Sequence, residues 1–492
     1  MNARSTGSGV CSASCASGAS INDATGICSS PSCAAPTRTG AARATRLPVT
    51  TVARRTANTA AVFRRCPAHP RRRTPDPFRR APRRARFVAR HTAGLLKEHG
   101  MTHAATGAAI GTPIGAVRPR PVLMIPLRRC GSHALRLRLN LNSQFYSPYP
   151  LHIVDFMPLL PLYGDLADDR AYFRLVADIV GLQAASMVKW PGVAFDPVEI
   201  FDALRHAPRS AHRIVWELLL RAGEREGARV VMDKSLDSVH YADELMTLYP
   251  DMLFLNVVRD PRAQVASMNR AIIHDFDTLL NAQAWVAAHR AADVLIARHP
   301  QRVLTIRYED FLSDQAHTLQ CVCAFFGIDF LPRMLDIANS PEARHISRMS
   351  ELWASNCFAP IAANADKFKQ QLSTAEIATI ETLAHEYMQR YGYQQMTDAT
   401  AMPDAFAAAA ARRRSDARRR HAWRELEQSN FRDFVLRRHR ADYLETVRAR
   451  LQRHASAHAD SRADLRADSP TDSPAGAPGR RDTLTAAFDV TD

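Results

Sequence analysis

An arginine and a serine stand eight residues apart, Arg259 and Ser267, where a strand is expected to give way to a helix. The mostly apolar run at 253–258 predicts a short buried strand, and Pro261 stands at the favoured first position of the following helix. Free N–H groups at a helix start bind anions, and a guanidinium and a hydroxyl add further donors. The spacing therefore predicts a phosphate-binding corner.

A second unit of strand, loop and helix is expected upstream, over residues 123–142. Residues 121–125 predict a short buried strand, and a loop follows to Gly131. From 132 to 142 leucines alternate with polar residues, which is typical of a strand. We nevertheless expect a helix there, because a cradle of this kind needs one. Two such cradles predict a ligand with anionic groups at both ends.

The strands and helices that position these residues are expected to alternate along the chain. Strands are also expected at 229–232 and 303–308, and helices at 168–189, 197–204, 214–226, 237–249, 261–273, 279–299, 314–326 and 373–391. Alternating strands and helices at this spacing predict an α/β fold with a mostly parallel central sheet flanked by helices. Residues 404–455 are rich in Ala and Arg and predict a basic amphipathic helix or helical pair.

Composition divides the 492 residues into four expected parts: a basic low-complexity arm at 1–117, an α/β domain at 118–395, a helical extension at 396–455 and a disordered tail at 456–492. Residues 1–100 hold 18 Lys and Arg against three acids, so they carry nearly all of the net charge of +16. The arm has too few apolar residues to offset its ordering entropy, so we expect it to be disordered.

Three interpretations of the arm stay open. We favour a disordered or wrongly assigned N-terminus, with Met101 as the natural start. A transit peptide is the second, because the arm is rich in Arg and Ser and poor in acids. A nucleic-acid-binding arm around 71–73 and 79–86 is the third.

The two cradles, together with the segment Arg307-Tyr308-Glu309-Asp310-Phe311, resemble the sulfotransferase superfamily that uses 3′-phosphoadenosine 5′-phosphosulfate (PAPS) as sulfuryl donor. The resemblance covers about residues 120–394 and is strongest over 258–267. A later segment, 355–373, is similar to the family's loop that folds over the nucleotide. The resemblance implies a P-loop-like α/β fold and makes 118–395 the sulfotransferase domain.

The first loop departs from the family pattern of a basic residue followed by Ser-Gly-Thr-Thr. Here Arg129 stands at the basic position and Gly131-Ser132 at the Gly-Thr, while Cys130 and His133 replace hydroxyl residues. Backbone N–H groups supply most of the cradling in such loops, so these replacements do not by themselves abolish binding.

The resemblance implies roles for individual residues. Arg129 would hold the 5′-phosphosulfate, with the loop residues Cys130, Gly131, Ser132 and His133, and Lys234 would add a cation at the bridging oxygen. The remaining implied contacts are Arg259 and Ser267 on the 3′-phosphate, Lys367 closing over it, Tyr308 near the adenine and Ser355 at the phosphate next to the sulfonate. No metal is expected, because positive side chains take its place.

The general base is expected in the segment 149–155, about twenty residues after the first cradle. Many relatives have a Glu or His there, and Pro150 stands where some have the Glu. His152 is our candidate because an imidazole titrates near neutral pH, and Asp155 is second. The alternative for His152 is a half-buried structural histidine.

The expected function is transfer of a sulfuryl group from PAPS, by in-line displacement, to a hydroxyl or amine of a carbohydrate, lipid or small molecule. A degenerate nucleotide-binding or interaction protein stays open as an alternative. A P-loop kinase is a weaker one, because no Lys follows Gly131.

The acceptor cannot be read from the residues, although its selectivity is expected to lie in 143–211 and in the C-terminal helices. No apolar run approaches the ~20 residues of a membrane span, so the cytoplasm is the expected compartment. We expect no specific nucleic-acid partner, and the extension offers a possible homodimer surface.

Overall fold

The computed structural model describes residues 118–358, 364–398 and 400–467. The expected arm at 1–117 and residues 468–492 of the expected tail lie outside the described residues. Five strands form one sheet in the order β2-β3-β1-β4-β5, and every neighbouring pair is parallel. The strands are β1 Arg120–Ile125, β2 Phe145–Tyr146, β3 Val230–Asp233, β4 Leu253–Val258 and β5 Val303–Arg307. The predicted α/β fold with a mostly parallel sheet is confirmed.

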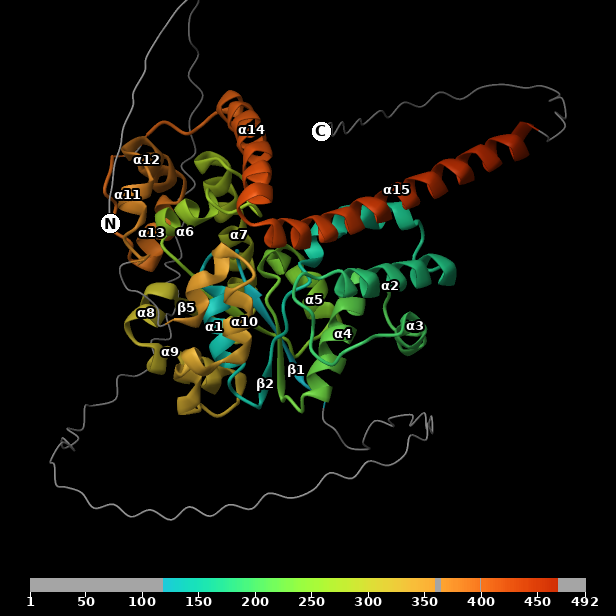
Figure 1. Ribbon diagram of the computed structural model, residues 1–492, viewed down its shortest axis with the longest axis horizontal. Helices are drawn as coiled ribbons and strands as arrows, with labels where there is room; N and C mark the ends of the chain where they lie inside the picture. The colour runs from blue at the N-terminus through green and yellow to red at the C-terminus, as the bar shows by residue number, and fades with distance from the viewer. Residues whose placement is uncertain (1–117, 359–363, 399, 468–492) are drawn as a thin grey trace, which may run out of the picture. The chain divides into compact units, whose positions relative to one another are not determined.

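The helices that surround the sheet follow the strands in the chain (Figure 1). They are α1 Ser132–Leu139, α2 Asp169–Ala184, α3 Pro197–Leu204, α4 Ala211–Arg225, α5 Ala242–Leu248, α6 Pro261–Met268, α7 Thr278–Arg298, α8 Tyr308–Ser313, α9 Gln315–Phe326, α10 Pro341–Ser347, α11 Phe368–Gln371, α12 Thr374–Leu383, α13 His385–Tyr391, α14 Ala405–Ser429 and α15 Phe431–Ala467.

Each face of the sheet is covered by its own group of helices. Along β1, Leu123 and Ile125 face a core built with α2, α4 and α7, whereas Val122 and Met124 face a core built with α1 and α9. This alternation is the expected period of a strand, and both sides are apolar because both are buried.

The helix α1 forms where the leucines alternate with arginines. Leu135, Leu137 and Leu139 are buried, and so are Arg136 and Arg138 between them. A helix buried on all sides loses the usual spacing of apolar residues, which explains the strand-like pattern. Arg136 donates to the Ser147 carbonyl at 2.5 Å and pairs with Glu342 at 2.7 Å, so its charge is neutralised inside the protein.

Parallel pairing brings the chemically active loops to one edge. Because β1, β3, β4 and β5 run in the same direction, the segments that follow them meet at the carboxyl ends of the strands, where α/β sheets bind ligands. Pro261 begins α6 as predicted, but α6 ends at Met268, short of the expected 273.

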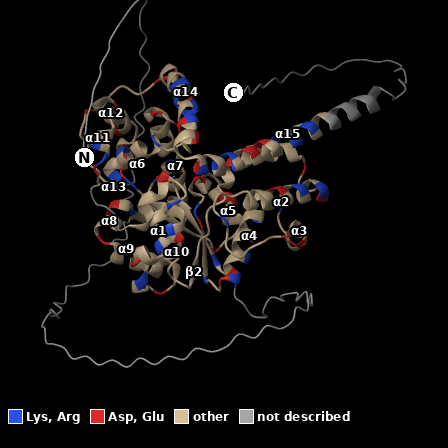
Figure 2. Cartoon of the chain, in the orientation of Figure 1, with Lys and Arg blue, Asp and Glu red and all other residues tan. Residues whose placement is uncertain are grey.

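The C-terminal extension consists of two helices, α14 and α15, and arginines recur along α14 and along the described part of α15 (Figure 2). α15 continues to Ala467, past the expected boundary at 455. Val447 and Leu451 of α15 are buried in the larger core, together with residues of α2. The extension therefore packs on the domain through apolar contacts as well as through charge.

In residues 118–358, 364–398 and 400–467, no helix combines the length and the apolar character that crossing a bilayer requires.

Replacing Arg136 by Ala tests how far α1 depends on its buried arginines. We expect a loss of about 3 kcal/mol in the free energy of unfolding, because a cavity forms and two polar contacts disappear. Urea denaturation measures the change. Arg298→Ala is the control, because Arg298 pairs with Asp243 at the surface and should change stability by less than about 0.5 kcal/mol. A loss below about 1 kcal/mol for Arg136→Ala would contradict a structural role for this buried arginine.

Candidate active site

The loop after β1 turns into α1 at Gly131. Gly131 has a φ of +89°, and a Cβ atom there would lie 2.2 Å from the Tyr308 ring, so only glycine fits. This close approach brings Tyr308, the first residue of α8, against the start of α1. The first cradle is therefore closed on one side by an aromatic ring from the end of β5.

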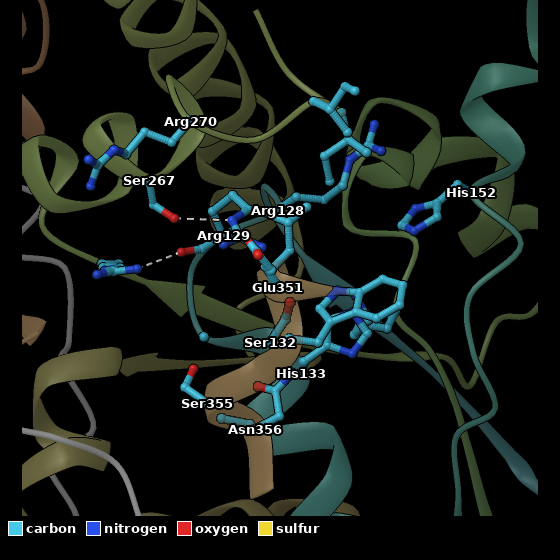
Figure 3. A pocket seen from close by; sticks show the side chains of 18 of the residues that line it. Arg128, Arg129, Ser132, His133, His152, Ser267, Arg270, Glu351, Ser355 and Asn356 are labelled. Carbon is cyan, nitrogen blue, oxygen red and sulfur yellow. Dashed lines mark hydrogen bonds between the residues drawn. The ribbon is translucent and has the colours of Figure 1, made fainter. Parts of the chain in front are cut away.

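A cavity of about 700 Å³ opens at this edge, within the ~300–1,000 Å³ range of small-molecule sites. It is lined by residues that follow β1, β3, β4 and β5 and by residues from the C-terminal half of the chain (Figure 3). Its described lining holds two acids, Asp155 and Glu351, and eight basic side chains, Arg128, Arg129, Lys234, Arg259, Arg270, Lys367, Arg437 and Arg440. The excess of positive charge favours an anionic ligand.

Three of the predicted residues converge on one corner of the cavity. Arg129 Nε donates to Ser267 Oγ at 3.1 Å, and Arg259 Nη1 donates to the Arg129 carbonyl at 2.9 Å (Figure 3). The Arg259 guanidinium also lies over the Tyr308 ring, 4.8 Å from its centroid. Arg129 and Arg259 thus lie side by side, whereas we expected them at opposite ends of a ligand.

Burial, together with the neighbouring Arg259, lowers the pKa of Arg129 to about 10. The Arg259 Nε atom is buried and has no hydrogen-bond partner among the described residues. Buried donors without partners are costly, so this corner is built to receive acceptor atoms from a ligand.

Lys234 follows β3 and is almost completely buried in the cavity wall, with 2% of its surface exposed. Burial, reinforced by Arg136 and Arg128, lowers its pKa to about 7. A buried ammonium group with so little compensation is poised to interact with a negative charge.

His152 lines the same cavity and has a left-handed backbone, with φ 51°. Its backbone N–H donates to Ser235 Oγ at 3.2 Å, which ties the segment to the end of β3. Burial, then the positive charges of Arg128 and Lys234, lowers the pKa of His152 well below its usual value. The imidazole is therefore neutral at neutral pH and has a lone pair to accept a proton.

Asp155, the second candidate base, is engaged in ion pairs. Its carboxylate lies 3.0 Å from Arg440 and 3.8 Å from Arg128, and Arg128 also pairs closely with Asp237. Because two guanidinium groups occupy the Asp155 carboxylate, His152 stays the preferred candidate for the base.

The other predicted residues divide between the cavity and the core. Gly131, Ser132, His133, Tyr308, Ser355 and Lys367 line the cavity. The Cys130 side chain instead lies in the apolar core beneath the loop, where burial raises its thiol pKa to about 11. Only the backbone of Cys130 is available for a ligand, because its thiol points into the core.

An aromatic wall that the sequence did not reveal lines the same cavity. The His133 ring stacks on Tyr149 with centroids 5.9 Å apart, and Trp353 lies 5.7 Å from His133 and 5.6 Å from Tyr149. These rings come from α1, from the loop after β2 and from the turn at 351–357. No spacing in the sequence relates them, since the fold alone brings them together.

The C-terminal helices also contribute to the cavity, which sequence analysis proposed only in general terms. Trp423 of α14 and Arg437, Arg440 and Leu444 of α15 line it. Arg437 pairs with Asp433 at 2.8 Å and lies over the Trp353 ring at 5.7 Å. The helical extension is therefore part of the site and not an appendage to it.

Residues 121–332 match the sequence profile of the sulfotransferase family, so this region of the chain is similar to sulfotransferases. No curated protein matches the chain.

Several solved structures are similar to the chain, among them the following three. A sulfotransferase domain from the olefin synthase of Synechococcus PCC 7002 is 20% identical, with a TM-score of 0.41, and the match covers 58% of this chain and 98% of that one. A sulfotransferase domain from the curacin biosynthetic pathway is 17% identical, with a TM-score of 0.38, over 57% of this chain and 99% of that one. A sulfotransferase from Mycobacterium avium is 14% identical, with a TM-score of 0.33, over 57% and 79%.

The lowered pKa of Lys234 predicts that this side chain reduces the free energy of unfolding of the ligand-free protein by an amount that depends on pH. Between about pH 7 and 10.5 the unfolded chain keeps the Lys234 proton and the folded chain does not, so raising the pH in this range stabilises the fold. Lys234→Met removes this contribution. We expect the variant to be more stable than the wild type at pH 7, and its advantage to shrink by pH 9, as measured by urea denaturation.

The control for this comparison is Lys189→Met, because Lys189 is exposed and donates to the Ala184 carbonyl near its own position in the chain. Its difference from the wild type should not change between the two pH values. An advantage of Lys234→Met that stays constant from pH 7 to pH 9 would show that Lys234 is not held with a lowered pKa.

Proposed function

We propose that this protein transfers a sulfuryl group from PAPS to a hydroxyl or amine acceptor. The observation that carries the proposal is the convergence of Arg259, Arg129 and Ser267 beside α6, with Lys234 in the same cavity. PAPS carries anionic groups at both ends of one nucleoside, and the match of residues 121–332 to the sulfotransferase family supports a sulfuryl donor.

The donors of the cavity fit the two ends of PAPS. Arg259 and Ser267 would bind the 3′-phosphate, and the unpartnered Arg259 Nε supports this assignment. Because Arg129 Nε donates to Ser267 Oγ, we assign Arg129 to the same phosphate instead of the phosphosulfate. Lys234 and the N–H groups at the start of α1 would hold the 5′-phosphosulfate.

In the transfer step, the acceptor oxygen or nitrogen attacks the sulfur atom, and the bond from sulfur to the bridging oxygen breaks. The electron pair of that bond stays on the phosphate, which leaves as adenosine 3′,5′-bisphosphate. By analogy with phosphoryl transfer, the residues act mainly by positioning and by charge stabilisation. Lys234 would neutralise the charge that develops on the bridging oxygen.

The acceptor's proton would pass to the His152 imidazole. Burial and then the cations around His152 lower its pKa, and the negative charge of a bound donor would offset the part due to the cations, so the imidazole would be a stronger base when the donor is present. The same negative charge keeps Lys234 protonated. The aromatic wall of His133, Tyr149 and Trp353 offers an apolar surface to the body of the acceptor. A screen with labelled sulfuryl donor against glycans, lipids and phenols would identify the acceptor class.

Arg259→Ala should weaken binding of adenosine 3′,5′-bisphosphate by ~1.5–3 kcal/mol, about 10- to 150-fold, because a charge-assisted contact to the 3′-phosphate is lost. Calorimetry without magnesium measures the affinity, and Arg298→Ala is the control at an exposed position. Unchanged binding in Arg259→Ala would overturn the assignment of the anion corner. A wild-type protein that binds only magnesium-ATP, or no nucleotide, would overturn the proposed function.

Lys234→Ala should reduce turnover far more than nucleotide affinity, because its ammonium group acts on charge that develops in the transition state. We expect kcat to fall by ~100-fold or more, by comparison with the removal of one oxyanion donor, with less than a tenfold change in nucleotide affinity. Turnover is measured with an acceptor from the screen, and Lys189→Ala serves as the control. Equal losses in kcat and affinity would contradict the role of Lys234.

A further inference from the structure

Arg440 of α15 makes three contacts with the segment that carries His152, although almost 290 positions separate them in the chain. Its Nη2 atom donates to the carbonyl oxygens of Leu151 at 2.9 Å and His152 at 3.2 Å. Its Nη1 atom pairs with the Asp155 carboxylate at 3.0 Å. One guanidinium therefore holds the segment at points before, at and after His152.

The conformation that Arg440 holds is unfavourable by itself. His152 has φ 51° and ψ 55°, and the left-handed region costs a residue other than glycine roughly 1–2 kcal/mol. Such a conformation persists only where its surroundings fix it. Ser235 Oγ accepts the His152 N–H on one side, and Arg440 takes the His152 carbonyl on the other.

Arg440 is presented by a helix that is fixed on both sides of it. On the N-terminal side, the Asp433 carboxylate accepts from Arg437 and from Ser350 Oγ, and all three groups are buried. On the C-terminal side, Tyr443 donates to the Asp178 carbonyl at 2.9 Å, and Val447 is buried in the larger core. The position of the guanidinium is thus set by the packing of α15 on the domain.

We propose that Arg440 is a positioning residue that holds the His152 segment so that the imidazole faces the cavity. The inference rests on the proposed function, in which His152 accepts the acceptor's proton. Arg440 acts through the Leu151 and His152 carbonyls and Asp155, and it needs no contact with either substrate. The C-terminal extension thereby becomes a required part of the catalytic site.

The charged and titratable groups that face His152 come from several elements. They are Arg128 of the first loop, His133 of α1, Lys234 after β3, Arg440 of α15 and, within the segment itself, Asp155. When Arg440 is removed, burial and the charges of Arg128 and Lys234 still keep the imidazole neutral at neutral pH. Loss of Arg440 should therefore lower kcat without changing the shape of its pH profile near neutrality.

The test is Arg440→Ala, with Arg440→Met as a second variant that keeps the apolar stem packed. We expect kcat to fall by ~10- to 100-fold in both, because misplacement of a catalytic group by about 1 Å costs up to ~100-fold. The KM for PAPS and the affinity for adenosine 3′,5′-bisphosphate should stay within twofold of the wild type. Arg440→Lys, which keeps a donor, should recover part of the lost kcat.

The matched control is Arg448→Ala, which removes the same charge from an exposed position of the same helix, where Arg448 pairs only with Glu445. It should leave every parameter unchanged. Hydrogen exchange gives a readout that needs no activity: amides of 152–156 should exchange faster in Arg440→Ala and at the wild-type rate in Arg448→Ala.

Two outcomes would overturn the inference. One is an unchanged kcat with unchanged exchange at 152–156 in the Arg440 variants. The other is a loss of kcat matched by an equal loss of nucleotide affinity, which would mean a general disturbance of the site. If the wild type neither binds the nucleotide nor transfers the sulfuryl group, the proposed function fails. Even then, faster exchange confined to 152–156 in Arg440→Ala would support the conclusion that Arg440 holds this segment in place.

Discussion

The arrangement of the site depends on keeping several positive charges together at one edge of a parallel sheet, where burial makes each of them costly. The fold compensates some of these charges and leaves others open. Arg128 is paired with Asp237 and Asp155, whereas Lys234 is buried in the cavity wall with its pKa lowered to about 7. In the ligand-free protein, the buried positive charges lower the stability of the fold. A bound anion compensates these charges, so the free energy that is recovered contributes to the affinity for the anion.

The sequence predicted the elements whose local signals agree with one another. Residues 253–258 form β4 and Pro261 begins α6, because an apolar run and a proline specify the strand and the helix start independently. Ser373 and Glu376 form a capping box at the start of α12, inside the helix expected at 373–391. By contrast, the short strand β2 was missed, because two residues, Phe145 and Tyr146, carry too little periodicity to be recognised.

The three-dimensional arrangement of the candidate site was harder to predict from the sequence than the identity of its residues. Arg129 was named from its position in the loop, but its place beside Ser267 follows from a left-handed backbone, φ 73°, which no spacing rule indicates. Trp353 and Arg440 were not named because they reach the cavity only through tertiary packing. Local patterns identify residues that lie next to a strand end, and contacts across hundreds of positions require the three-dimensional structure.

Part of the cavity wall lies within the residues that match the sulfotransferase family, and part lies beyond them. Arg129, Lys234 and Arg259 lie within residues 121–332, whereas Trp353 and Arg440 lie beyond it. Under the proposed function, Arg129, Lys234 and Arg259 bind the donor, and the aromatic wall and the C-terminal helices border the acceptor. Since donor chemistry is the same for every acceptor, we expect selectivity to come from these acceptor-facing parts, of which Trp353 and both C-terminal helices lie beyond the family match. Changes in α14 or α15 can then alter the acceptor while the grip on the nucleotide stays the same.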